Sequence, residues 1–93
     1  MIRSFRHREA EKVFGRIWSA RLPGDIQQVA LRKLRMLNRA RTLNDLRVPP
    51  ANRLERLRGE RAGRYSIRIN QQWRICFRWD AGDAFEVEIV DYH

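Results

Sequence analysis

The spacing of apolar residues changes part-way along this chain, and that change constrains the fold more than any other feature. Up to about residue 41 the apolar side chains recur every three or four positions, which predicts helices. From residue 53 onward they alternate with polar side chains, which predicts strands with one buried face. The sequence therefore predicts an α+β fold in which two N-terminal helices pack on a twisted, mainly antiparallel sheet.

The helical half of the chain divides at Pro23 and Gly24, which interrupt its pattern. The first helix is expected over residues 7–20, after a short edge strand at residues 2–5, and Asp25 is placed to cap the second helix. The apolar stripe of the first helix is Ala10, Val13, Phe14, Ile17 and Trp18. The inward stripe of the second is Ile26, Val29, Ala30, Leu34 and Leu37, and its mostly outward set is Arg32, Lys33, Arg35, Arg39 and Arg41.

Residues 42–52 are expected to connect the helices to the sheet. Pro49 and Pro50 stop a helix and do not fit a central strand, and Leu43 and Leu46 are expected to pack beneath the connector.

Alternating segments follow the connector and predict an antiparallel sheet. Residues 59–63 are expected to form a hairpin turn, residues 70–72 a second bend, and residues 80–83 a third turn. The side chains expected to face the helices are Tyr65, Ile67, Ile69, Trp73, Ile75, Phe77, Trp79, Phe85, Val87 and Ile89.

Composition adds a charge argument to this fold. The chain has 93 residues, 43% apolar and 33% charged, which suits a single globular domain over residues 1–93. Basic residues outnumber acidic ones by 20 to 11, and the net charge of +9 favours a polyanionic partner. Every basic residue except Lys12 and Lys33 is arginine, which grips phosphate with a planar fork, although a GC-rich genome would give the same bias. Residues 79–93 are acidic instead.

Several kinds of site are excluded by the sequence. With Cys76 as its one cysteine, the chain forms neither an internal disulfide nor a cysteine-based zinc site. Its two histidines lack ligand spacing and no glycine-rich phosphate loop leads into a helix, so neither a metal nor a cofactor is implied. No apolar run suits a membrane span or a signal peptide, so a cytoplasmic location without membrane contact is expected.

The polar face of the predicted strands is the candidate binding surface. Arg68, Arg74 and Arg78 are expected to project from neighbouring strands, close enough to hold one phosphate or two consecutive ones. The alternative is that these arginines pair across strands with Glu86 and Glu88 on a solvated face.

The C-terminal residues Asp91, Tyr92 and His93 combine an acid, an aromatic ring and an imidazole. Histidine titrates near neutral pH and transfers protons in phosphodiester cleavage, while a tyrosine ring can stack on a base. These groups allow a metal-independent nuclease. A frayed terminus without a catalytic role is the alternative.

Four stretches of the chain closely resemble the HigB toxins, which belong to the RelE/ParE superfamily and are also called plasmid maintenance killer proteins. They are NRLERLRG at residues 52–59, GRYSIRIN at 63–70, QWRICF at 72–77 and VEIVDYH at 87–93. The resemblance covers essentially the whole chain, and it implies a RelE/ParE-like domain that acts as a ribosome-dependent mRNA endonuclease. It also implies a HigA-like helix-turn-helix antitoxin that neutralises the toxin and binds the shared operator DNA.

The resemblance carries catalytic roles to Arg58, Asp91, Tyr92 and His93, and makes Arg74 a contact to the phosphate or the transition state. The residues expected to bind RNA are Arg56, Arg64, Arg68 and Arg78.

One departure from the family pattern affects the expected chemistry. Many HigB toxins have lysine where this chain has Arg58, and some have histidine in place of Glu55. Arginine stabilises a pentavalent phosphorane as lysine does, but its high pKa makes it a poor proton donor. Proton transfer is therefore expected to fall on His93, with Asp91 orienting it or acting as the base.

Two other functions are compatible with this sequence. A ParE-like toxin would inhibit DNA gyrase without cutting RNA, although such toxins generally lack the Asp91-Tyr92-His93 ending. A degenerate toxin would mainly bind the antitoxin and assist repression.

Overall fold

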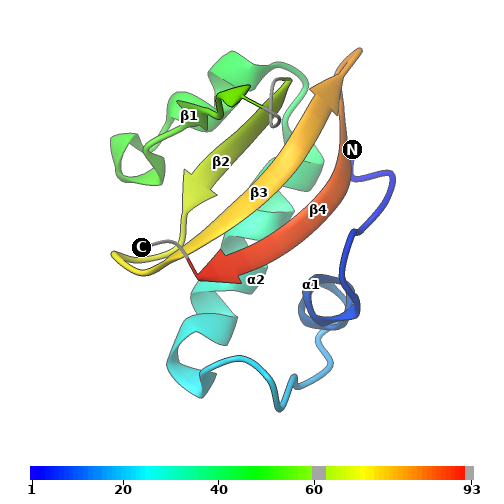
Figure 1. The fold of residues 1–93 in the computed structure, drawn as a ribbon, viewed down its shortest axis with the longest axis vertical. Coiled ribbons are helices and arrows are strands. Elements are labelled where there is room, and N and C mark those ends of the chain that lie inside the picture. The colour runs from blue at the N-terminus through cyan, green and yellow to red at the C-terminus, as the bar shows by residue number, and fades with distance from the viewer. Residues whose placement is uncertain (60–62, 92–93) are drawn as a thin grey trace.

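The computed structural model describes residues 1–59 and 63–91, and it confirms the α+β architecture. Helices α1 (Arg8–Phe14) and α2 (Gly24–Arg39) are followed by two short 3-10 helices, η1 (Leu43–Arg47) and η2 (Pro50–Asn52). The strands are β1 (Glu55–Arg56), β2 (Arg64–Arg68), β3 (Trp73–Asp80) and β4 (Asp83–Asp91). They form a sheet in that order, and each pair of neighbours is antiparallel (Figure 1).

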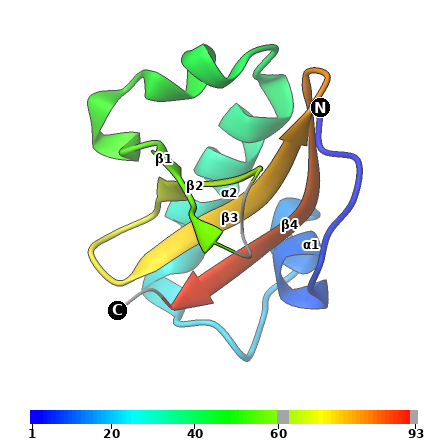
Figure 2. The same cartoon turned by 45° about the horizontal axis from the view of Figure 1, so that its top comes forward.

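Both helices cover the same face of the sheet, called the inner face below, with α2 beneath β3 and α1 beside β4 (Figure 2). The core lies between these layers. Ile75 and Phe77 of β3 are fully buried there, as are Leu34 and Leu37 of α2. The predicted inward stripe of α2 is therefore confirmed, and its partly exposed member Val29 also packs against the core. Burying four such side chains favours folding by roughly 6–12 kcal/mol before conformational entropy is subtracted.

Helix α1 is shorter than predicted, because it ends at Phe14 instead of continuing to residue 20. Arg16 takes a left-handed backbone conformation with φ of 63°. The Ile17 N–H then donates to the Lys12 carbonyl at 2.8 Å and the Arg16 N–H to the Val13 carbonyl at 3.0 Å, a pattern that terminates a helix. Ile17 and Trp18 consequently leave the apolar stripe and are 59% and 66% exposed.

Two expectations for α2 are wrong. Pro23 occupies the N-cap position and Asp25 lies inside the first turn without capping it, because Gly24 already begins the helix. Lys33 was expected on the outward side but is buried, with its ammonium donating to the amide oxygen of the buried Asn52. No helix within residues 1–59 or 63–91 is long and apolar enough to cross a membrane.

A β-bulge in β4 changes which side chains face the core. Cys76 pairs with Glu88 but Arg78 pairs with Phe85, so an extra residue is inserted around Glu86, whose φ is 53°. The prediction that Phe85 faces the helices is therefore wrong. Ala84 takes the inner face opposite Trp79, and Phe85 lies opposite Arg78.

The N-terminal segment lies along the free edge of β4, as the expected edge strand would. Ile2 and Phe5 form isolated parallel bridges to Ala84 and Val87, and the Arg3 N–H donates to the Ala84 carbonyl at 2.7 Å. In the connector, Leu46 is 1% exposed, which confirms that it packs underneath.

Candidate functional site

The face of the sheet opposite the helices, called the outer face below, carries the candidate site. Side chains of residues paired across neighbouring strands lie on the same face, so the strand registers define its rows. One row contains Arg64, Arg78 and Phe85; the next contains Glu55, Ser66, Cys76 and Glu88; the last contains Arg68, Arg74 and Val90. Alternation in the sequence correctly predicted Arg68, Arg74 and Arg78 on this face.

Arg74 is buried and is held at several points of its guanidinium. It is 7% exposed, and its Nε donates to Ser66 Oγ at 2.8 Å. Its Nη2 donates to the carbonyl oxygen of Arg53 at 2.6 Å, and its Nη1 lies 3.5 Å from a carboxylate oxygen of Glu55. A guanidinium fixed in this way places a permanent positive charge at a defined point of the outer face.

Arg78 pairs with Glu86, as the alternative interpretation of this face predicted for it, and Arg64 pairs with glutamates as well. Arg64 lies 3.0 Å from Glu86 and 3.1 Å from Glu88, and Arg78 Nε lies 3.4 Å from Glu86. Arg78 also stacks over the Phe85 ring, 4.6 Å from its centroid. The charges of both arginines are therefore partly balanced inside the protein.

Glu88 carries further basic neighbours from the N-terminal segment. His7 Nε2 lies 3.2 Å from one of its carboxylate oxygens, and Arg6 Nη1 lies 3.6 Å from the other. Glu88 is thus contacted from β2 by Arg64 and from the N-terminal segment by Arg6 and His7, and the sequence alone did not indicate the N-terminal contacts.

Arg68, Arg56 and Arg58 differ in their relation to Arg74. Arg68 pairs with Arg74 in the register and donates from Nε to the Asn70 carbonyl at 3.0 Å. Arg56 pairs with Tyr65, so it faces the inner side at the edge of the sheet and does not join the outer face. Arg58 is exposed in the segment after β1, directly beyond the buried Leu57.

One of the predicted acid–base residues lies at the end of β4. Asp91 is the last residue of β4 and pairs with Trp73, so its side chain lies on the inner side of the sheet edge; it accepts a hydrogen bond from Gln72 Nε2 at 3.0 Å. Tyr92 and His93 lie outside the described residues. The register therefore places Arg68 and Arg74 at one end of the outer face, while Asp91 ends the neighbouring strand with its side chain on the opposite face.

Sequence reasoning missed the residues that position Arg74. Ser66 was treated as a polar residue between apolar ones, and the Arg53 carbonyl gave no signal at all. Across residues 1–59 and 63–91, His, Cys, Asp and Glu side chains form no group of three suited to a metal ion.

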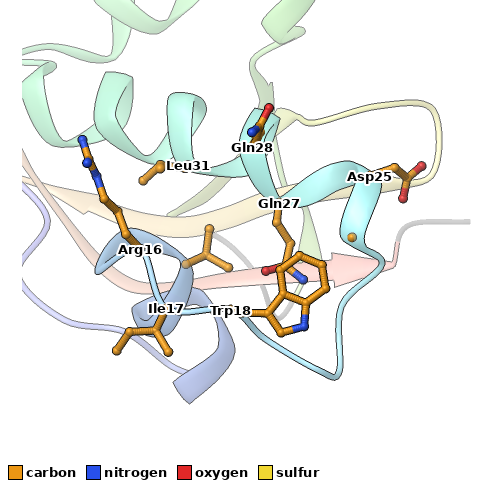
Figure 3. A pocket seen from close by; sticks show the side chains of 9 residues that line it. Arg16, Ile17, Trp18, Asp25, Gln27, Gln28 and Leu31 are labelled. Carbon is orange, nitrogen blue, oxygen red and sulfur yellow. The ribbon is translucent and has the colours of Figure 1, made fainter.

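A hollow lies away from the outer face, between the α1–α2 loop and the start of α2 (Figure 3). It measures about 530 Å³ and is bordered by Arg16, Ile17, Trp18 and Leu31, so we call it the Trp18 hollow. The Trp18 ring lies so close to Gly24 that a Cβ there would come within 2.7 Å of Trp18 Cη2. Apolar and polar side chains both line this hollow, which is separate from the outer face.

Residues 3–93 match the family of HigB-like toxins, the RelE-like toxins of type II toxin–antitoxin systems. This chain belongs to that family. Two helices on an antiparallel sheet agree with a RelE-like toxin fold.

Three relatives of this HigB-like chain are informative. Toxin HigB-1 of Vibrio cholerae serotype O1 is 44% identical over 63 residues, which cover 68% of this chain and 66% of the relative. An uncharacterized protein of Haemophilus influenzae is 39% identical over 65 residues, covering 70% of this chain and 64% of the relative. Endoribonuclease HigB of Proteus vulgaris is 31% identical over 94 residues, covering 100% of both chains. The first two matches therefore span slightly less than two thirds of those relatives.

Proposed function

We propose that this protein is a type II toxin that cleaves mRNA on the ribosome as a metal-independent endoribonuclease. The observation that carries the proposal is the buried Arg74 guanidinium, fixed on β3 beside β4, the strand that ends at Asp91. The name of the full-length Proteus relative, an endoribonuclease, supports the same activity.

The reaction assigns one role to each candidate residue. The 2′-hydroxyl of RNA loses its proton to a base and attacks the adjacent phosphorus, and the bond from phosphorus to the 5′-oxygen breaks. Arg58 and Arg74 stabilise the extra negative charge on phosphorus. His93 protonates the leaving 5′-oxygen, Asp91 orients His93 or serves as the base, and Tyr92 stacks on a base of the substrate.

The RNA-binding role falls most naturally on Arg68, which is partly exposed and lies next to Arg74. Arg64 and Arg78 pair with glutamates, so they bind RNA only where a phosphate displaces Glu86 or Glu88 from their guanidinium groups. Arg56 would contact RNA from the sheet edge. A HigA-like helix-turn-helix antitoxin is proposed as the partner that neutralises the toxin and links it to operator DNA, in the cytoplasm and without membrane contact.

Mapping RNA 5′ ends soon after induction in bacterial cells tests this function. We expect new ends inside translated reading frames for the wild type, and loss of these ends together with growth arrest for Arg58→Ala and His93→Ala. Arg35→Ala is the matched control, because Arg35 is an exposed arginine of α2 on the other side of the sheet. Unchanged cleavage by both site variants would refute the catalytic assignments.

Two alternative functions give different results in the same cells. Altered plasmid supercoiling without new RNA ends would indicate a ParE-like gyrase inhibitor. Normal growth, combined with an operator shift that requires both toxin and antitoxin, would indicate a co-repressor.

A further inference from the structure

A second hollow opens beside the proposed site, where α2, η2 and the β2–β3 hairpin meet. It measures about 480 Å³, and its polar lining is Arg32, Lys33, Arg53, Arg68, Asn70 and Gln71. We call it the Lys33 hollow. Its lining residues all lie in the described part of the chain, and none of them is acidic. Four cationic side chains therefore surround one small volume.

The charge of Lys33 is not paired with a carboxylate of the described chain. Lys33 is 6% exposed, and its ammonium donates to Asn52 Oδ1, a neutral oxygen. Asn52 is itself 0% exposed and fixed by donating from Nδ2 to the carbonyl oxygens of Leu46 and Val48, at 3.2 and 3.4 Å. Within residues 1–59 and 63–91, no carboxylate forms an ion pair with Lys33.

A buried ammonium without a counter-ion is unfavourable. Burial lowers the pKa of Lys33 below its ordinary value, and the neighbouring charge of Arg32 lowers that pKa further. An anion seated in the hollow would relieve both effects, because it would supply the negative charge that the protein does not.

The hollow is continuous with the outer face through Arg53 and Arg68. Arg53 is one of the residues that line the hollow, and its carbonyl oxygen accepts a hydrogen bond from Arg74 Nη2 at 2.6 Å. Arg68 also lines the hollow and is the register partner of Arg74. One extended polyanion can therefore contact Arg74, then Arg68, and then enter the hollow.

We propose that the Lys33 hollow binds a backbone phosphate of single-stranded RNA that flanks the cleaved bond. This inference rests on the proposed function for its choice of RNA and adds a contact outside the reacting phosphate. Arg32 and Arg53 bind the phosphate oxygens as forks, and Lys33 supplies the buried charge beneath them.

Binding of a short unstructured RNA, measured by fluorescence anisotropy over a range of salt concentrations, tests the hollow directly. We expect Arg32→Ala and Lys33→Met to weaken binding several-fold and Arg35→Ala, from the same helix, to leave it nearly unchanged. The slope of log affinity against log salt should become shallower by about 0.7 in Arg32→Ala, as for one lost phosphate contact on a single strand. Equal losses in Arg32→Ala and Arg35→Ala would overturn the inference.

The side-chain NMR signal of Lys33 gives a readout that a merely destabilised variant does not mimic. RNA should shift this signal in the wild type at the concentrations that saturate binding, and inorganic phosphate should shift it only at far higher concentrations. A signal that responds to inorganic phosphate but not to RNA would overturn the assignment to RNA.

A ribosome-bound cleavage reaction with wild-type protein separates this inference from the proposed function. Absence of cleavage, with RNA binding that depends on Arg32, would refute the nuclease and support the hollow. Normal cleavage, with RNA binding that is indifferent to Arg32 and Lys33, would support the nuclease and refute the hollow.

Discussion

At the scale of single residues, Arg74 combines burial with charge in a way that favours arginine over lysine. Its planar fork reaches Ser66, the Arg53 carbonyl and Glu55 from different nitrogens. The single ammonium of a lysine would reach fewer of these groups from the same backbone position. The same network that stabilises the fold therefore also fixes the proposed phosphate contact.

Replacing Arg74 is expected to affect stability and cleavage together. Arg74→Ala leaves Ser66 Oγ and the Arg53 carbonyl without their partner, which should lower the free energy of unfolding by roughly 1–3 kcal/mol. Cleavage of ribosome-bound mRNA should fall by about 10²-fold or more, because a preorganised charge is lost. Urea denaturation and a single-turnover cleavage assay measure the two effects.

Arg74→Lys serves as the informative companion variant. It should fold with a smaller loss of stability and still cleave more slowly than the wild type. Full activity in a well-folded Arg74→Lys protein would show that the fork geometry is dispensable. Arg35→Ala, on the exposed side of α2, should change neither quantity.

Side-chain positions could be predicted where simple alternation holds, and not where the backbone departs from it. Arg74 and Ile75 fall on opposite faces as alternation requires. Phe85 does not face the core, because the bulge at Glu86 shifts it by one position, and no glycine marks that bulge in the sequence. The helical pattern placed Lys33 on the exposed side of α2. Its burial could not be predicted, because its hydrogen-bond partner Asn52 is 19 residues away in the chain.

At the scale of elements, the end of α1 shows why a helix terminus is hard to predict, because its glycine lies one residue before the left-handed position. Glycine usually takes the left-handed position after a helix, but here Gly15 precedes that position and Arg16 occupies it. A helix that continued through Trp18 was therefore a reasonable prediction from apolar spacing alone. The sheet was easier to predict, because large apolar side chains recur at every second position of the sequence along β3 and much of β2 and β4.

The start of η1 depends on Asp45. Its Oδ2 accepts the N–H groups of Arg41 and Thr42 at 2.9 and 3.1 Å. These two backbone hydrogen bonds, that from Arg41 first, lower the pKa of Asp45 below its ordinary value of 3.8. The carboxylate thus stabilises the folded state above pH 3.8, and this contribution is lost as the pH falls through the lowered pKa.

The variant Asp45→Asn tests this dependence. It should be less stable than the wild type at neutral pH, and the difference in unfolding free energy should narrow as the pH falls below 3.8. Thermal unfolding of both proteins at a series of pH values measures this difference in unfolding free energy. Asn44→Ala, a neighbouring change in η1 without a titrating group, should give a difference that does not depend on this pH range. A constant difference for Asp45→Asn would contradict the role given to its carboxylate.

At the scale of the whole molecule, the net charge of +9 opposes the compact state. The pairs that Arg64 makes with Glu86 and Glu88 are partly buried and are screened less by salt than the exposed arginines are. Added salt should therefore relieve repulsion more than it weakens these pairs. We expect the melting temperature to rise from low to physiological sodium chloride, by a few degrees for a gain on the order of 1 kcal/mol.

The control for this effect is a protein of lower charge. The double variant Arg35→Gln/Arg39→Gln removes two positive charges from the exposed side of α2 and should show a smaller rise. A melting temperature that falls with added salt would mean that ion pairs, and not repulsion, dominate the stability of this fold.

The exposure of Trp18 gives the protein a built-in optical probe. Trp18 is 66% exposed and lines the Trp18 hollow, whereas Trp73 and Trp79 are partly buried against the core. Trp18 should therefore emit at longer wavelengths than the other two and be quenched more readily by iodide. Any molecule that covers the helical side would change this emission, and RNA on the outer face would leave it unaltered. Fluorescence can thus assign a bound partner to one side of the sheet without any added label.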